Sequence, residues 1–501
     1  MKINKMRLKI VFPAAALFVL FSCGLKNNSG EQQSTGQHPN VLFISVDDLN
    51  DWLGCMNGHP NTKTPNIDKL AAQGILFSNA HCQAPLCGPS RASLMTGLRP
   101  STTGIYGMID DNKIKADNET TEDIILLPEY FKNHGYHTMG IGKLFHHHAP
   151  DGLFDESGGR NPGFGPKPEE RFVWDGYGTS DRDKYGRTST DWGAYPEADS
   201  LMPDHHSADW TIERLNRNYE KPFFLAVGFL RPHVPLYVPP KWFDLHPVES
   251  LAMTPYKEND LEDVPPIAHL INDLPMMPST EWAIENNQWA NIIQAYLACV
   301  SFVDYEVGRV LNALENSQHA KNTVIVLWSD HGYRMGEKGT FAKHALWEEA
   351  TNAPLIFAAP NLPSGKVIDS PAEMLSIYPT LLDLCGLPAY ELNEGINLVP
   401  LMQDEEPDEN APFAVTTFGW NNHGLRTSNF RYIRYEDGGE ELYDHREDPN
   451  EWINIAGKTE NEAIKAELQE LLPKNDSRWN VHSQYTFQPY FVEQKERVGT
   501  E

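Results

Sequence analysis

The sequence predicts an α/β fold, in which helices flank a large, mostly parallel sheet, followed by a small C-terminal subdomain with an antiparallel sheet. Three observations predict it. Apolar runs of strand length recur along most of the chain, segments with helical spacing separate them, and the pattern becomes alternating after residue 390. We therefore expect a main domain over residues 39–390 and an α+β subdomain over residues 391–501.

The first predicted strand is Asn40–Val46, an almost continuous apolar run of the kind that is covered on both faces. A helix follows from Asn66 to Ala71, and Gly74 ends it before a short strand at Ile75–Phe77. Further strands are predicted at Tyr136–Ile141, Phe223–Phe229 and Thr323–Ser329, and further helices at Leu126–Asn133 and Trp282–Leu314.

The C-terminal part alternates polar and apolar residues at Phe413–Thr417 and Phe430–Tyr435, which predicts two antiparallel strands packed against a helix near Asn461–Leu472. Two long segments interrupt the alternation of strands and helices in the main domain. Asp151–Asp204 is rich in Gly, Pro and aromatic residues, and Pro239–Pro278 is rich in Pro and acidic residues. Long loops of this kind are often functional, so we expect both to face the substrate.

The N-terminus reads as an export signal over residues 1–22, because a basic start precedes an apolar run too short to span a bilayer. Residues 20–24 resemble a bacterial lipobox, with Cys23 as the acylated residue and a flexible polar tether over 23–38. We expect an exported lipoprotein of the cell envelope, in the periplasm or at the outer membrane, that meets the membrane only through this anchor.

The chain has 501 residues, of which 40% are apolar, and a net charge of −28. This charge excludes nucleic acid as a partner, since phosphate contacts rest on clustered Lys and Arg. The cysteines show no metal-binding spacing. Four cysteines lie outside the signal and the motif around Cys87: Cys55, Cys82, Cys299 and Cys385. They are free or form disulfides, and the sequence leaves both possibilities open.

Polar side chains follow four of the apolar runs, at the strand ends where open α/β sheets bind their ligands. The four groups are Asp47-Asp48, Lys143 with His146, Arg231-Pro232-His233, and Ser329-Asp330-His331-Gly332. Three carboxylates among them are hard oxygen ligands that would repel one another without a cation. We expect one Ca²⁺, with Mg²⁺ as the alternative ion and simple helix capping by Asp47 and Asp48 as the alternative without a metal.

Cys87 opens the run Cys87-Gly88-Pro89-Ser90-Arg91, in which Pro89 suits the first position of a helix and Arg91 places a cation near its start. A buried, inert structural cysteine is the alternative reading. The run Cys87–Gly97 resembles the maturation motif of type I sulfatases. In that family the cysteine is oxidised by a separate maturase to formylglycine (3-oxoalanine), so the resemblance implies an aldehyde hydrate as nucleophile at Cys87.

Other motifs resemble the iduronate-2-sulfatase branch of this family: Pro65–Asp68, Thr96–Pro100, Gly142–His146, Arg231–Pro235 and Lys338–His344. The resemblance implies an alkaline-phosphatase-like sulfatase fold. It also implies a metal site formed by Asp47, Asp48, Cys87, Asp330 and His331, and a sulfate pocket completed by Arg91, Lys143, His146, His233 and Lys343. His331 stands where many sulfatases have Asn, so it binds the formylglycine or sulfate as well as, or instead of, the ion.

The family mechanism implies that one hydroxyl of the aldehyde hydrate attacks sulfur, that His233 or Lys343 protonates the departing oxygen, and that His146 accepts a proton from the second hydroxyl. For His147, His148 and His344 a functional and a purely structural role weigh equally. The expected substrate is a sulfated polysaccharide or its oligosaccharides, of the uronate 2-O-sulfate type or an algal polymer such as ulvan. The alternatives are a phosphate or phosphonate ester hydrolase of the same superfamily and a catalytically dead carbohydrate-binding lipoprotein.

Overall fold

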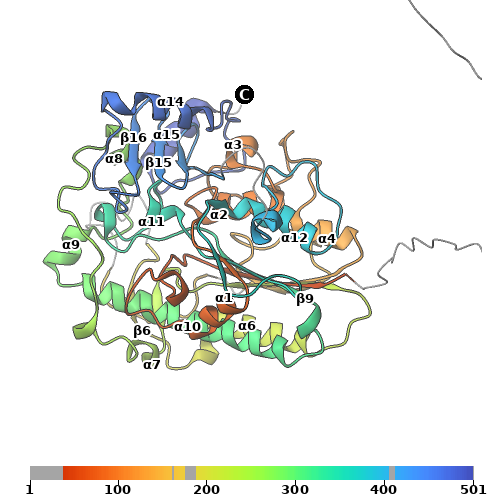
Figure 1. The fold of residues 1–501 in the computed structure, drawn as a ribbon. Coiled ribbons are helices and arrows are strands. Elements are labelled where there is room, and N and C mark those ends of the chain that lie inside the picture. Colours follow the sequence, from red (N-terminus) through yellow and green to blue (C-terminus); the bar gives the residue numbers. More distant parts are fainter. Residues whose placement is uncertain (1–37, 161–162, 175–187, 405–411, 500–501) are drawn as a thin grey trace, which may run out of the picture. The chain divides into compact units, whose positions relative to one another are not determined.

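The computed structural model describes residues 38–160, 163–174, 188–404 and 412–499. The expected signal, Cys23 and all of the tether except residue 38 lie outside these residues. The main domain is built on an eight-stranded sheet (Figure 1). In spatial order its strands are β11 (Lys366–Ile368), β2 (Ile75–Phe77), β10 (Leu355–Ala358), β9 (Thr323–Ser329), β1 (Asn40–Val46), β7 (Phe223–Phe229), β4 (His137–Gly142) and β5 (Glu156–Gly159).

The sheet is mostly parallel, as the sequence predicts, and β10 is its antiparallel member, paired with both β2 and β9. Side chains of β1 alternate between two cores. Leu42 and Ile44 join the core formed with α1 (Pro65–Gln73), α6 (Pro203–Leu215) and α10 (Trp289–Glu315). Val41 and Phe43 join the core formed with α2 (Cys87–Thr96), α4 (Leu127–Asn133) and α12 (Ile377–Leu384). Burial on both faces explains why the strand is apolar throughout.

Shorter elements surround this framework. Two further pairs of strands lie in the described part of the main domain: β3 (Ala80–His81) with β12 (Ala372–Glu373), and β6 (Trp192–Ala194) with β8 (Leu236–Val238). Further helices in the described ranges are α3 (Pro100–Thr103), α7 (Pro240–Phe243), α8 (Pro266–Asn272), α9 (Thr280–Glu285), α11 (Glu348–Thr351), α13 (Val399–Met402) and α15 (Pro489–Val498).

Two local predictions were wrong. The single helix expected over 282–314 is two helices, α9 and α10, because Asn287 adopts a left-handed backbone with φ of 53° that ends the first. Helix α2 begins at Cys87, so Pro89 is its third residue and not its first. A proline is still tolerated there, since the N–H groups of the first helical turn have no partner within the helix.

The C-terminal antiparallel sheet contains four strands, β13 (Ala414–Thr417), β14 (His423–Arg426), β15 (Phe430–Arg434) and β16 (Glu440–Asp444). Its inner face packs on α14 (Glu462–Glu470) through Leu425, Tyr432 and Leu468. The expected antiparallel sheet at the C-terminus is therefore confirmed. The chain after α14 leaves this sheet, and its residues Tyr485 and Phe491 pack in the core of the main domain.

Cys55, Cys82, Cys87, Cys299 and Cys385 are all free thiols. Within the part of the chain that the structure describes, no helix has the length and apolar character needed to cross a membrane.

Candidate active site

The four groups of polar residues predicted at strand ends lie side by side, because β9, β1, β7 and β4 are neighbours and run parallel. In a parallel arrangement the carboxyl ends share one edge of the sheet. Helix α2 delivers Cys87 and Arg91 to the same edge, and the loop after β9 delivers Lys343. The fold thus brings together residues from positions 47 to 343 of the chain.

Three carboxylates form the centre of the site. The side chains of Asp47, Asp48 and Asp330 are completely buried. Asp48 adopts a left-handed backbone with φ of 61°, and its N–H donates to Oδ1 of Asp330 over 3.1 Å. This bond fixes the two strand ends to each other, so the carboxylates of β1 and β9 are held in one group.

Arg91 binds two of these carboxylates from α2. Its Nε donates to Oδ2 of Asp330 at 2.9 Å and its Nη2 to Oδ1 of Asp47 at 3.2 Å, while Nη1 donates to the Ser45 hydroxyl. Burial alone would lower the pKa of Arg91, but Asp330 and Asp47 raise it above its ordinary value. The guanidinium is fully buried and acts here as the fixed counter-ion that orients the acidic groups.

Two lysines complete the charge balance. Lys143 Nζ lies 3.0 Å from Oδ2 of Asp47, and Lys343 Nζ donates to Oδ1 of Asp48 at 2.6 Å. Burial raises the pKa of Asp47, yet Lys143, Arg91 and Lys343 bring it well below its ordinary value. Burial would lower the pKa of Lys343, but Asp48 and its neighbours raise it well above that of a free lysine. Lys343 therefore remains cationic at neutral pH.

Cys87 is the first residue of α2 and is 1% exposed. Its Sγ lies 3.2 Å from Lys343 Nζ, 3.4 Å from His331 Nε2 and 3.9 Å from Oδ1 of Asp48. Burial, and then Asp47, raise the pKa of this thiol well above its ordinary value. A neutral thiol is a poor nucleophile. Cys87 is thus central to the site and unreactive in the form that the gene encodes.

Three histidines surround this centre. Nδ1 of His331 hydrogen-bonds the Gly332 carbonyl at 2.9 Å and Nδ1 of His233 that of Val234 at 2.6 Å, so each ring turns Nε2 away from the backbone. His233 also stacks on Phe164, with 4.7 Å between ring centroids. Burial and the charge of Lys343 hold the pKa of His233 well below its ordinary range, and burial and Lys143 do the same for His146. Both imidazoles are therefore neutral.

The acidic groups fit a divalent cation. Ligand atoms of Asp47, Cys87, Asp330 and His331 all lie within 4.8 Å of one another. Oδ2 of Asp47 forms the ion pair with Lys143 but accepts no hydrogen bond, and Oδ2 of Asp48 accepts none from any residue that the structure describes. Buried carboxylate oxygens without donors are the hard ligands that Ca²⁺ takes. The donor set therefore suits Ca²⁺, and Mg²⁺ remains compatible with it.

A pocket of about 430 Å³ opens above these residues and reaches His146, His233 and Lys343. Both long insertions contribute to its wall, the first through Phe164 and the second through Met276 and Met277. The expectation that these insertions face the site is thus met by their described residues.

The three histidines left undecided by the sequence fall at different places. His344 is 5% exposed and lines the pocket beside Lys343, His147 lines it and is exposed, and His148 is exposed without being among the described lining residues. The wall also includes Gln484–Phe487, which the sequence analysis did not select. No motif marks that segment, and only its pairing with a distant loop places it at the pocket.

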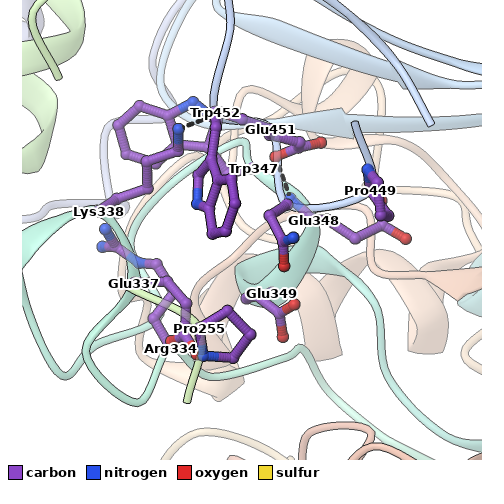
Figure 2. Close-up of a pocket in the computed structure, with 11 residues that line it drawn as sticks. Pro255, Arg334, Glu337, Lys338, Trp347, Glu348, Glu349, Pro449, Glu451 and Trp452 are labelled. Atoms are coloured by element: carbon purple, nitrogen blue, oxygen red, sulfur yellow. Dashed lines mark hydrogen bonds between the residues drawn. The ribbon is translucent and has the colours of Figure 1, made fainter. Parts of the chain in front are cut away.

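A second, largely buried cluster of charges lies between the main domain and the C-terminal sheet. Ligand atoms of Glu348, His445 and Glu451 come within 4.8 Å of one another, so this group also has the spacing of a metal site. Two arginines pair with the carboxylates of this cluster. Arg426 Nε donates to Glu348 at 3.0 Å, and Arg431 Nε donates to Glu451 at 3.1 Å. Figure 2 shows Glu348 at the start of α11 next to Glu451, whose carboxylate accepts from the Glu348 N–H at 2.8 Å. We therefore describe it as an ionic clasp between the two parts of the chain.

Comparison with known proteins agrees with this site. Residues 39–387 match the family described as Sulfatase, and residues 336–478 match the C-terminal region of N-sulphoglucosamine sulphohydrolase. A sulfatase from Formosa agariphila is 64% identical over 95% of this chain and 94% of its own length. Human iduronate 2-sulfatase is 32% identical, over 73% of this chain and 72% of its own.

Two further similarities are more distant. An ulvan-active sulfatase from Formosa agariphila is 28% identical over 94% of this chain and 87% of its own length. Among solved structures, BT1596, described as a 2-O GAG sulfatase, superposes with a TM-score of 0.64 at 23% identity, covering 93% of this chain and 94% of the other. The latter similarity concerns the fold, which is the alkaline-phosphatase-like fold of sulfatases. The chain belongs to the sulfatase family and is a sulfuric ester hydrolase.

Proposed function

We propose that this protein removes sulfate from sulfated saccharides by means of a formylglycine generated from Cys87 and one Ca²⁺. The position of Cys87 carries the proposal: a buried, protonated thiol lies 3.2 Å from a lysine and 3.4 Å from a histidine, against a group of carboxylates. A thiol with a raised pKa is unsuited to attack sulfur. The aldehyde hydrate that a maturase would generate there supplies the hydroxyl that the thiol cannot.

Asp47, Asp48, Asp330 and His331 would hold the metal, and bound Ca²⁺ would supply Lewis-acid stabilisation of charge on the sulfuryl oxygens. Lys143 and Lys343 add fixed positive charge at the same place, within a buried setting that strengthens the effect. Arg91 keeps the carboxylates in position.

Proton transfer falls to residues at the pocket. Lys343 lines the pocket as a cation and can protonate the departing alcohol directly, whereas His233 lines it as a neutral imidazole and would first have to take up a proton. Nδ1 of His146 is buried and accepts no hydrogen bond from the described residues. Because this imidazole is neutral, it can accept the proton that must leave position 87 when sulfate is released.

The relatives narrow the substrate class. One is named for iduronate 2-sulfate and another for ulvan, and the similar solved structure is described as a 2-O glycosaminoglycan sulfatase. All three act on sulfated carbohydrate or are named for it. We propose a uronate 2-O-sulfate in a glycosaminoglycan or algal polysaccharide, reached by an exported lipoprotein anchored at Cys23 in the cell envelope.

The test is to express the protein with and without a formylglycine-generating maturase and to compare peptide masses at Cys87 with sulfate release. Heparin, dermatan sulfate and ulvan oligosaccharides form the panel, and matched sulfate and phosphate esters of 4-nitrophenol are the small substrates. We expect aldehyde at position 87 only with the maturase, and sulfate release only from that sample. Cys87→Ala, made with the maturase, is the control and should be inactive.

Faster turnover of the phosphate ester than of its matched sulfate would assign the protein to the phosphate or phosphonate hydrolases of the superfamily. An unmodified Cys87 in the presence of the maturase, together with saccharide binding, would identify a dead carbohydrate-binding protein.

A further inference from the structure

The segment Gln484–Phe487 lies beyond both regions matched by known families, which end at residues 387 and 478, and yet it forms part of the active-site wall. All four residues line the pocket that contains His233 and Lys343. We call this segment the C-terminal wall.

A pair of backbone hydrogen bonds fixes the C-terminal wall to the loop that contains Met108. The N–H of Gln484 donates to the Met108 carbonyl and the N–H of Met108 to the Gln484 carbonyl, both at 2.8 Å. Met108 in turn packs on Gly88, where a Cβ would lie 2.9 Å from its sulfur. One residue thus links the wall to the neighbour of Cys87, so the wall keeps a defined position relative to the reacting group.

Two further contacts fix the residues on either side of the C-terminal wall. The N–H of Gly107 donates to the Ser483 hydroxyl at 2.9 Å, and the side chain of Gln488 donates to the Ile271 carbonyl. A Cβ at Gly107 would come within 2.6 Å of the Gln484 backbone, so this close approach requires glycine. A wall held in this way loses little conformational entropy when a ligand binds to it.

The side chains of the C-terminal wall are those of a carbohydrate subsite. Phe487 lines the pocket and leaves 41% of its surface exposed, an aromatic face against which the C–H groups of a sugar ring can be buried. Gln484 and Thr486 are exposed, and their side chains form no hydrogen bond with any residue in the described ranges. An amide and a hydroxyl next to an aromatic ring suit the hydroxyl groups of a sugar.

The charge of the pocket supports the same kind of ligand. Among its described lining residues, Asp48 and Lys343 are the charged ones, and both belong to the catalytic centre. Phe164, Met276 and Met277 extend the uncharged surface. The described part of the pocket beyond the sulfate position therefore offers apolar contact and neutral hydrogen-bonding groups to a ligand.

We propose that the C-terminal wall is the subsite for the carbohydrate part of the substrate, with Phe487 against the face of a sugar ring and Gln484 and Thr486 bonded to its hydroxyl groups. The inference rests on the proposed function, because it assumes that the sulfate ester belongs to a saccharide.

The test measures binding without turnover. In a Cys87→Ala background, calorimetry gives the Kd of a heparin-derived disaccharide with a 2-O-sulfated uronate, of ulvan oligosaccharides and of inorganic sulfate. Adding Phe487→Ala should weaken the tightest-binding saccharide about tenfold, the scale of one lost aromatic contact. The Kd of inorganic sulfate should stay within about twofold, since sulfate alone does not reach the wall.

The matched control is Tyr305→Ala on α10, since Tyr305 is likewise 41% exposed and is not among the described lining residues of the pocket. It should leave all these Kd values unchanged. The inference is overturned by a saccharide Kd that Phe487→Ala leaves within twofold, by equal weakening of inorganic sulfate, or by the lack of saturable saccharide binding. Failure of the proposed function would appear elsewhere, as a matured enzyme that releases no sulfate from any saccharide.

Discussion

Among the described residues, two clusters of charge have the spacing of a metal site, one fully and one largely buried, and they differ in how their carboxylates are satisfied. In the ionic clasp, Arg426 and Arg431 donate to Glu348, and Arg431 and His445 donate to Glu451. In the catalytic centre, Oδ2 of Asp47 and Oδ2 of Asp48 receive no hydrogen bond from the described residues.

The difference shows how a functional charge cluster can be told from a structural one. A buried charge is tolerated when it is paired and fully hydrogen-bonded, and an incomplete network is costly. In the clasp, both carboxylate oxygens of Glu348 and of Glu451 accept hydrogen bonds. The catalytic centre leaves carboxylate oxygen atoms available for a ligand. We expect substitutions in the first cluster to lower stability and those in the second to lower activity.

The largest effect is expected from Asp48→Asn. It should lower sulfate release at least about a thousandfold, because it removes a ligand oxygen and the partner of Lys343. Burial and Asp47 raise the pKa of Asp48, so its charged form is disfavoured in the metal-free protein, although Lys343 offsets part of this. The free energy of unfolding in EDTA should therefore change little. A large loss of stability in urea titrations would contradict the comparison.

Arg431→Met should act in the opposite way. It leaves Glu348 and Glu451 buried with fewer donors, and breaking such a pair costs about 3–5 kcal/mol of unfolding free energy. The kcat of the folded fraction should stay within about twofold. If kcat instead falls like that of Asp48→Asn, the clasp has a catalytic role and the comparison fails.

The pH dependence of the clasp follows from the same contacts. Burial raises the pKa of Glu348, but Arg426 and Arg431 bring it well below the ordinary value of 4.5. A lowered carboxyl pKa stabilises the fold above pH 4.5 and loses this contribution as the pH falls through the folded value. The stability difference between wild type and Arg431→Met should therefore be constant near neutrality and shrink in acid, as urea titrations at several pH values would show.

Chelation should have an intermediate effect confined to the catalytic centre. A hundredfold excess of Ca²⁺ over its Kd should raise the unfolding free energy by about 2.7 kcal/mol, since only the folded chain assembles the site. EDTA should remove both this gain and the activity, and Ca²⁺ should restore them. Asp48→Asn should lose most of the gain, and Arg431→Met should keep it. Identical unfolding curves with and without Ca²⁺ would contradict the assignment of a metal.

The smallest effect is expected from Lys69→Ala. Its ion pair with Glu315 spans 2.8 Å, but both side chains are more than half exposed. Solvent screens such a pair, so its loss should cost less than about 0.5 kcal/mol and leave kcat unchanged. The variant sets the baseline against which the two buried clusters are judged.

Much of the framework could be predicted because burial on both faces leaves a clear signal. The bounds of β1, β7 and β9 follow directly from their apolar runs, and the rule for strand ends in parallel sheets located Asp47, Lys143, His233 and Asp330. The break between α9 and α10 was missed, since it depends on the left-handed backbone of a single asparagine. The C-terminal wall could not be found either, because its place depends on pairing with Met108 across more than 370 residues.

The burial of Cys87 also sets an order of events in the life of the protein. At 1% exposure, at the start of helix α2 and against the buried carboxylates, the thiol cannot enter the active site of another enzyme once the chain has folded. Any enzyme that modifies it must therefore act on the chain before it folds. Folding speed and supply of that enzyme would then together decide what fraction of molecules becomes active, and a molecule that folds too early could not be repaired without unfolding.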